Sequence, residues 1–175
     1  MKKMILMGLA LALGPTVAMA QATKPLSFSD TAFIKGAAID NLAAIQAGQL
    51  ARSFGSAPVK AIGEAQVVDH TAMNVGLAAV AASKNVLLPT AIDESNMATM
   101  NGLAATRNGT SAGRGHQFDK AYFLGQIAGH QNTIALYEQE VSGGSDPDLK
   151  ALAARELPTL KKHLAEFTAA SKKKV

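Results

Sequence analysis

The chain has 175 residues, with no Cys, no Trp, two Tyr and six Phe, and a formal net charge of +4 from 17 basic and 13 acidic residues. The lack of Cys excludes disulfides, thiolate metal sites, Cys nucleophiles and the lipoprotein export route. The apolar content rests on Ala, Leu, Val and Ile rather than on large rings, which favours closely packed helices.

Residues 1–20 have the pattern of a Sec-type signal peptide. Two lysines precede an apolar run over residues 4–13, and small residues follow up to Ala20. The run is shorter than the roughly 20 residues that a membrane-spanning helix needs. We therefore expect cleavage after Ala20, with Ala22 as the alternative. The mature chain is then an exported protein of the periplasm or outer membrane, without a transmembrane segment.

Two long helices and one short helix are predicted in the first half of the mature chain. After a linker over residues 21–29, Ser27 or Ser29 can cap a helix that runs to about residue 53. A second helix is expected over residues 58–83, because Gly55 suits a helix end and Pro58 suits a first helical turn. A shorter, weaker helix follows over residues 93–106.

The second half predicts a Gly-rich loop and two more long helices. The loop covers residues 107–115, and the next helix runs from about His116 to residue 142. A turn at residues 143–145 leads into the last helix, which begins at Pro147. Four long helices with a small helix in the crossover predict an all-α, ferritin-like four-helix bundle. We expect a single domain over residues 30–171, followed by a basic tail at residues 172–175.

Polar side chains fall on or beside the apolar stripe of the helix that begins near His116. They are Asp119, Gln126 and His130. Polar groups at core positions need partners, because a buried unpaired charge costs several kcal/mol. With the turn at Gly144, His130 lies 14 residues before it and Glu156 lies 12 after it, while Gln126 at 18 matches His163 at 19. These four side chains are therefore expected to share one layer of the bundle.

The first hairpin supplies a matching pair. With its turn at Gly55, Asp40 and His70 are each 15 residues away, so they can face one another if their rotations agree. Asp69 competes with Asp40 for this role. Each hairpin then contributes at least one carboxylate and one imidazole to the core.

His and carboxylate side chains from several bundle helices predict a non-haem iron, manganese or zinc centre. The predicted ligands are His70, His130 and His163, with Asp69, Asp119 or Glu156 as carboxylate ligands or orienting partners. The same groups can instead form a hydrogen-bond network that stiffens the core, and both interpretations stay open. The sequence has no Glu-x-x-His pair, which weighs against a dinuclear site, and no nucleophile elbow for a Ser-His-Asp hydrolase.

These motifs carry a family resemblance. Asp69-His70, Phe118-Asp119-x-x-Tyr122, His130, Leu157-Pro158 and His163-Leu164 occur in an order and spacing that resembles the bacterial family catalogued as domain of unknown function 4142. The likeness covers about residues 33–167. It implies a ferritin-like helical bundle exported to the cell envelope, with no settled activity.

The chain departs from that family at two positions. Ala44 stands where the family often carries a Glu in its first helix, and the aromatic residue often found near Ile62 is missing. Loss of that Glu removes a natural bridging ligand for a dinuclear metal site. Asp40, one turn earlier, is the candidate substitute for it.

We expect a binding or stress-related envelope protein rather than an enzyme. The first alternative is a structural or partner-binding envelope module, whose His and carboxylate groups form a buried hydrogen-bond network. The second alternative is a diiron-type oxidoreductase. Nucleic acid is not an expected partner, because the mature chain carries a net charge near +2 without an aromatic and basic face.

Overall fold

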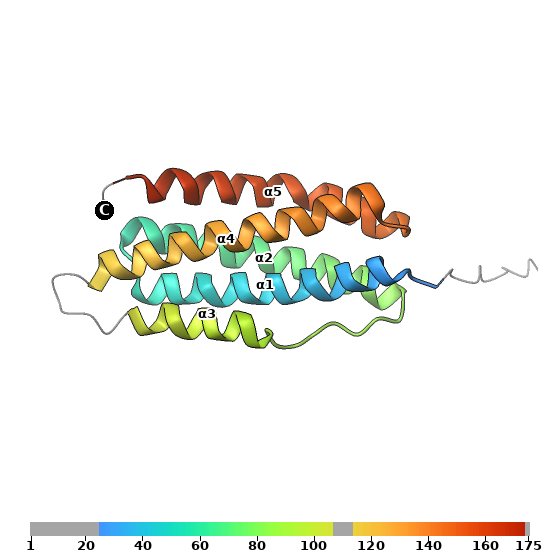
Figure 1. Cartoon of the computed structure of the whole chain (residues 1–175), viewed down its shortest axis with the longest axis horizontal. Helices are drawn as coiled ribbons and strands as arrows, with labels where there is room; N and C mark the ends of the chain where they lie inside the picture. Colours follow the sequence, from blue (N-terminus) through green and yellow to red (C-terminus); the bar gives the residue numbers. More distant parts are fainter. Residues whose placement is uncertain (1–24, 107–113, 174–175) are drawn as a thin grey trace, which may run out of the picture.

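The structure is a computed structural model that describes residues 25–106 and 114–173. The predicted signal peptide with its cleavage positions, residues 107–113 of the predicted loop and the last two residues of the tail lie outside the described residues. Five helices make up the described chain (Figure 1). They are α1 (Phe28–Phe54), α2 (Ala57–Ser83), α3 (Glu94–Ala105), α4 (Arg114–Gly143) and α5 (Pro147–Ser171).

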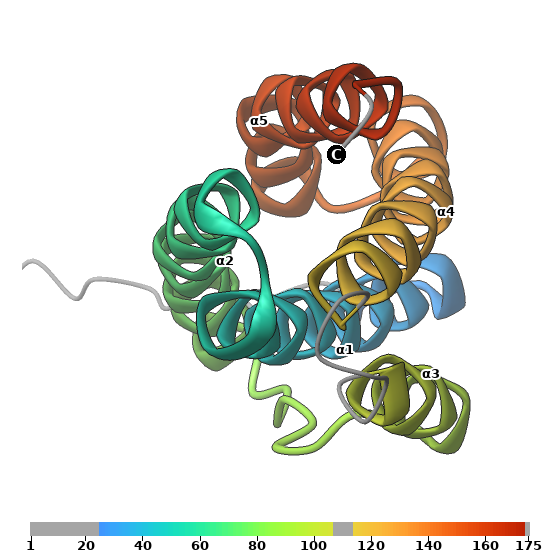
Figure 2. The same ribbon diagram turned by 90° about the vertical axis from the view of Figure 1, so that its left-hand side faces the viewer.

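The predicted all-α class is confirmed, because the described residues form helices, turns and loops and no strand. Viewed along the bundle, α1, α2, α4 and α5 surround a common axis, and α3 lies outside them against α1 and α4 (Figure 2). The ferritin-like description is consistent with this arrangement. None of the described helices is long and apolar enough to cross a membrane.

Capping residues set the helix ends close to their predicted places. Ser27 caps α1 in a capping box with Asp30, and Asp146 caps α5 by accepting from the backbone N–H groups of Asp148 and Leu149. One boundary was predicted wrongly, because α4 begins at Arg114, inside the stretch expected to be a loop. The Gly content of residues 107–115 predicts a loop, but the helix extends two residues into it.

The helices pair as two hairpins, α1 with α2 and α4 with α5, and α1 also packs along α4. The first hairpin is tight near its turn. A Cβ on Gly48 would lie 2.7 Å from the carbonyl oxygen of Gly63, and one on Gly63 would lie 2.6 Å from the Cβ of Ala51. The contact between α2 and α5, which closes the bundle, is sparser.

Two apolar clusters fill the bundle, and a polar layer lies between them. The cluster at one end contains Phe33, Ile34, Leu77, Tyr137 and Leu149. The cluster at the other end is built around the aromatic rings of Phe118, Tyr122, Phe123 and Phe167. The layer between them consists of buried polar side chains from all four long helices: Asn41, Gln66, His70, Gln126, His130, Glu156 and His163. Four of the predicted site residues lie in this layer: His70, His130, His163 and Glu156.

Candidate metal centre

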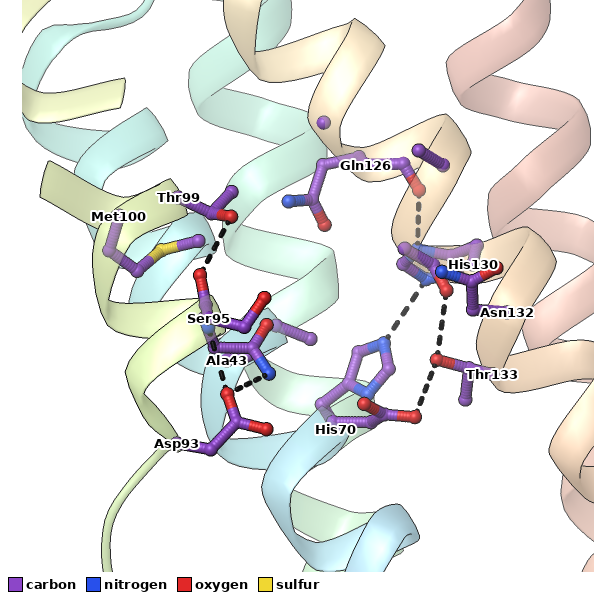
Figure 3. Close-up of a pocket in the computed structure, with 16 residues that line it drawn as sticks. Ala43, His70, Asp93, Ser95, Thr99, Met100, Gln126, His130, Asn132 and Thr133 are labelled. Atoms are coloured by element: carbon purple, nitrogen blue, oxygen red, sulfur yellow. Dashed lines mark hydrogen bonds between the residues drawn. The ribbon is translucent and has the colours of Figure 1, made fainter. Parts of the chain in front are cut away.

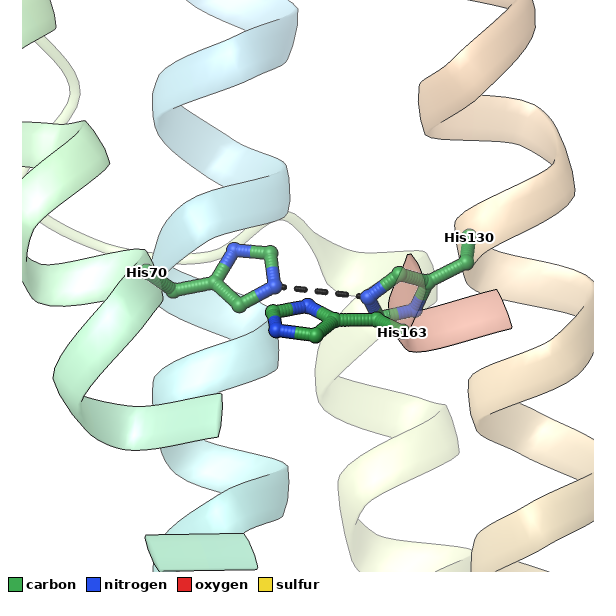
Figure 4. Close-up of side chains that lie close together, drawn as sticks. All are labelled: His70, His130 and His163. Carbon is green, nitrogen blue, oxygen red and sulfur yellow. Dashed lines mark hydrogen bonds between the residues drawn. The ribbon is translucent and has the colours of Figure 1, made fainter. Parts of the chain in front are cut away.

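Three imidazoles meet in the polar layer, one from each of three helices. His70 lies on α2, His130 on α4 and His163 on α5, and their exposed fractions are 1%, 3% and 3%. Their ring centroids form a nearly equilateral triangle with sides of 5.4, 5.3 and 5.5 Å. One ring nitrogen from each lies within 4.8 Å of the other two, and the rings face a common centre (Figure 4). The predicted meeting of these three histidines is therefore present.

Helix periodicity explains why each imidazole points inward. Every histidine shares its helix face with buried neighbours three, four or seven residues away. For α2 they are Gln66, Met73 and Leu77; for α4 they are Gln126, Thr133 and Tyr137; for α5 they are Glu156, Leu160 and Phe167. The apolar neighbours place the stripe in the core, so the imidazoles are carried into the interior with it.

The outer nitrogen of two rings is held by an oxygen acceptor. Nδ1 of His70 lies 2.9 Å from Oδ1 of Asn41, and Nδ1 of His130 lies 3.0 Å from the backbone carbonyl oxygen of Gln126. A ring nitrogen beside an oxygen acceptor carries the proton, so the lone pair of each ring is on Nε2. The two Nε2 atoms face each other at 3.3 Å. A cation between them satisfies both lone pairs.

The third ring follows the same rule with its nitrogens exchanged. Nε2 of His163 lies 2.9 Å from Oδ2 of Asp69, whose side chain is 37% exposed. The other nitrogen, Nδ1, is buried and has no hydrogen-bond partner among the described residues. An outer oxygen that fixes the tautomer and an inner nitrogen with a free lone pair are the usual arrangement of a metal-bound histidine.

The spacing of the two facing nitrogens also suits a metal ion. Nitrogens bound tetrahedrally to Zn²⁺ at about 2.05 Å lie about 3.3 Å from each other. Nε2 of His70 and Nε2 of His130 are 3.3 Å apart. The two sides of the nitrogen triangle that involve His163 are up to 4.8 Å long, so His163 has to move by up to about 1.5 Å to reach the same spacing.

A second proton arrangement fits the same heavy atoms. If the Asn41 amide turns over, its nitrogen donates to Nδ1 of His70, and Nε2 of His70 then donates to Nε2 of His130. The amide nitrogen of Asn41 is buried without a hydrogen-bond partner among the described residues. Rotation of the amide therefore also gives this nitrogen a partner, Nδ1 of His70. This arrangement corresponds to the predicted hydrogen-bond network, and it still leaves Nδ1 of His163 unpaired.

Burial keeps two of the imidazoles neutral. It lowers the pKa of His70 well below its usual value, and the charges of His130 and His163 lower this pKa further. Burial also lowers the pKa of His130 to about 4; the charge of His163 adds to this effect, and the Gln126 carbonyl opposes it. At neutral pH both rings therefore keep the lone pairs that a metal ligand needs.

The three predicted carboxylates are not gathered with the imidazoles in one group. Asp69 contacts the centre through its hydrogen bond to His163. Glu156 lies two helical turns from His163 on α5; it accepts from the Tyr137 hydroxyl at 3.1 Å. Burial raises the pKa of Glu156 to about 7, and its contacts with Tyr137 and the neighbouring arginine oppose this shift.

Asp119 has a structural partner at the end of the bundle. Its Oδ1 accepts from the backbone N–H of Ser56 at 3.0 Å, just before α2 begins. Asp119 lies 11 residues before His130 on α4, which places it about 16 Å along the helix axis. It is therefore too far away to join a metal site at the imidazoles. Asp40, the other carboxylate considered, accepts from the Thr133 hydroxyl at 2.9 Å.

Two groups orient the imidazoles in a way that the sequence did not predict, although Gln126 was expected in the same layer. Asn41 contacts His70, rather than the neighbouring Asp40 that the hairpin length predicts. The second group is a buried chain in which Tyr122 donates to Gln66 and the Gln66 amide donates to Gln126. It fixes the α4 turn whose carbonyl holds His130. Buried amides at helical spacing from each histidine are the signal that points to these residues.

A cavity of about 310 Å³ reaches the imidazoles from one side. It lies between α1, α4 and the short helix α3, and both His70 and His130 line it. Asp93, Thr99 and Met100 lie across the cavity from the two histidines (Figure 3). Asp40 lines the cavity as well. Burial raises its pKa; the Thr133 hydrogen bond opposes that, and the charge of Asp93 adds to it.

Comparison with known proteins finds a matching family model and a solved structure with a similar fold. The model of the family described as "Domain of unknown function (DUF4142)" matches residues 15–170. A solved crystal structure of a DUF305 fragment from Deinococcus radiodurans is similar, with a TM-score of 0.68 and 12% sequence identity, over 85% of this chain and 98% of that one. That likeness bears on the fold alone. No curated protein matches the chain.

Proposed function

Because the chain belongs to the DUF4142 family, whose description assigns no activity, we propose a function from the site itself. The protein binds one divalent transition-metal ion through His70, His130 and His163. It acts as a metal-binding protein of the cell envelope rather than as an enzyme. The observation that carries this proposal is the shared orientation of the three rings. Each ring has one nitrogen beside an oxygen acceptor and the other facing the common centre.

Three imidazole ligands favour zinc among the metals that the sequence predicts. Imidazole nitrogen suits Zn²⁺ and Fe²⁺, whereas Mn²⁺ prefers carboxylate and water oxygens. Asp69 supports the zinc site from outside, because its carboxylate holds the His163 tautomer and places a negative charge beside the ion. A dinuclear iron centre has less support, since the candidate metal group among the described residues contains imidazoles and no carboxylate.

Metal analysis of untagged protein tests the proposal. Protein purified under metal-depleted conditions and titrated with ZnCl₂ is expected to bind one equivalent, measured by calorimetry. The ion should raise the free energy of unfolding, by about 2.7 kcal/mol at a free zinc concentration 100-fold above Kd. That corresponds to a rise in Tm of roughly 5–10 °C for a domain of this size. Titrations with Fe²⁺ and Mn²⁺ rank the metals, and the absence of stoichiometric binding for all three contradicts the proposal.

Export is the second part of the proposal, and residues 1–20 support it. Their two lysines, short apolar run and small residues before Ala20 are typical of a signal peptide. When the full chain is expressed in a Gram-negative bacterium, we expect it in the periplasmic or outer-membrane fraction. Its mass should match a chain that starts at Gln21 or Thr23. Full-length protein in the cytoplasm would contradict export and leave the metal proposal intact.

A further inference from the structure

The imidazoles occupy three of the four long helices, and the fourth helix leaves space. Beside His70 and His130, α1 presents Ala43 and Ala44, whose side chains line the cavity. On α4, Gly125 and Gly129 line it too, and a Cβ at either position would meet nothing within 4 Å. Small side chains on both walls therefore keep the cavity open up to the two histidines.

Among the described residues, the charged side chains that line the cavity are all carboxylates. Asp40 and Asp93 line it, and no Lys or Arg occurs among the lining residues that the structure describes. Asp93 is fixed in place as the cap of α3, where its Oδ1 accepts from the backbone N–H of Asn96 at 2.8 Å. Asp40 is fixed by the hydroxyl of Thr133. A concave, carboxylate-lined surface raises the local concentration of cations and lowers that of anions.

Resting on the proposed function, we propose that this cavity is the route by which the divalent cation enters and leaves. Asp40 and Asp93 attract the hydrated ion, which then passes to His70 and His130 at the inner end of the cavity. A zinc ion with three protein ligands keeps an open fourth position, whereas a structural zinc ion is enclosed by four protein ligands. The protein then acts as a carrier or buffer of exchangeable metal, rather than using the ion as a structural support.

Stopped-flow association of Zn²⁺ with the metal-free protein tests the role of the carboxylates. The double substitution Asp40→Asn and Asp93→Asn keeps the shape of both side chains, and Asn remains a good helix cap. We expect zinc association to slow roughly tenfold at low salt, with a difference that shrinks as salt is added. The binding stoichiometry should stay the same. Glu94→Gln, which removes the next carboxylate along α3 and does not line the cavity, should leave the rate unchanged.

A second variant tests the route without changing charge. Gly129→Leu places a side chain in the open cavity and should slow both zinc association and chelator-induced release, while Kd changes little. Gly102→Leu is the matched control, since Gly102 is also a helical glycine with open space around it but lies off the cavity. Parental rates in both the carboxylate and the Gly129 variants overturn the route and leave the metal site standing. If the parent binds no metal, both proposals fall.

Discussion

Replacing His163 with leucine is expected to abolish stoichiometric zinc binding without weakening the metal-free fold. The inner nitrogen of His163 is buried and has no hydrogen-bond partner among the described residues, and an unpaired buried polar group costs about 1–3 kcal/mol. Leucine removes that cost at a similar side-chain volume. Asp69, the outer partner, is 37% exposed, so water can replace the hydrogen bond that it loses. We expect the metal-free variant to be as stable as the parent or more stable by about 1 kcal/mol.

The affinity of the same variant should fall by more than about 100-fold, the upper end of the loss seen when only an orienting partner of a metal ligand is removed. Calorimetry with zinc and urea unfolding of the metal-free proteins measure the two effects. His116→Leu is the control, because His116 is an exposed imidazole at the start of α4, away from the centre. A loss of about 1–3 kcal/mol in the metal-free variant, with a parent that binds no zinc, would favour the hydrogen-bond network instead.

Substituting Gly63 by alanine is expected to destabilise the bundle, because overpacking usually costs about 1–3 kcal/mol. The new Cβ would lie 2.6 Å from the Cβ of Ala51 and 2.8 Å from the carbonyl oxygen of Gly48, so α1 and α2 have to move apart. Alanine gains about 1 kcal/mol of helix propensity over glycine, which offsets only part of that cost.

Urea unfolding of Gly63→Ala beside Gly102→Ala separates the two contributions. Gly102 lies three residues before the end of α3, and a Cβ there would meet nothing within 4 Å. We expect its alanine variant to keep the parental stability or to gain up to about 1 kcal/mol. Equal stability of the two variants would show that the α1 and α2 backbones can separate at no cost near Gly63.

The fold was largely predictable because its boundaries carry strong local signals. Ser27, Gly55, Pro58 and Pro147 each mark a helix end through a backbone preference, independent of the rest of the chain. Where such a signal was weak, as at Arg114, the predicted boundary was wrong by two residues. The helix faces, which are also properties of the sequence, placed the three histidines in the core, but the hairpin lengths did not pair His130 with His163.

The partners of those histidines were harder to predict. The direction in which side chains lean along a helix explains the error in the predicted height of the contacts. Counting from Gly144 predicted that His130, at 14 residues, meets Glu156, at 12; instead it meets His163, at 19. Tyr137, at 7, meets Glu156 with the same offset of five residues. Side chains lean toward the N-terminus of their own helix, so those on α4 lean away from the turn and those on α5 lean toward it. A count of Cα positions misses this offset.

The rotation of a helix about its axis explains why Asn41, and not Asp40, contacts His70. A shift of one residue turns a side chain by about 100° around the helix axis. Hairpin length places Asp40 and Asn41 at nearly the same height, but only the rotation of α1 decides which of them faces the bundle. Asn41 is 1% exposed and contacts His70, whereas Asp40 turns toward Thr133 and the cavity. That rotation depends on the packing of the whole layer, which the sequence of one helix does not reveal.

Every donor of the candidate centre lies in the interior of a long helix, and none lies on a loop. His70 stands 13 residues from each end of α2, and His130 and His163 are also well inside their helices. The conformational entropy needed to bring the three rings together is therefore lost when the bundle folds, not when an ion binds. Apart from the small shift that His163 has to make, the site is preorganised, so it discriminates between ions by their radius and geometry.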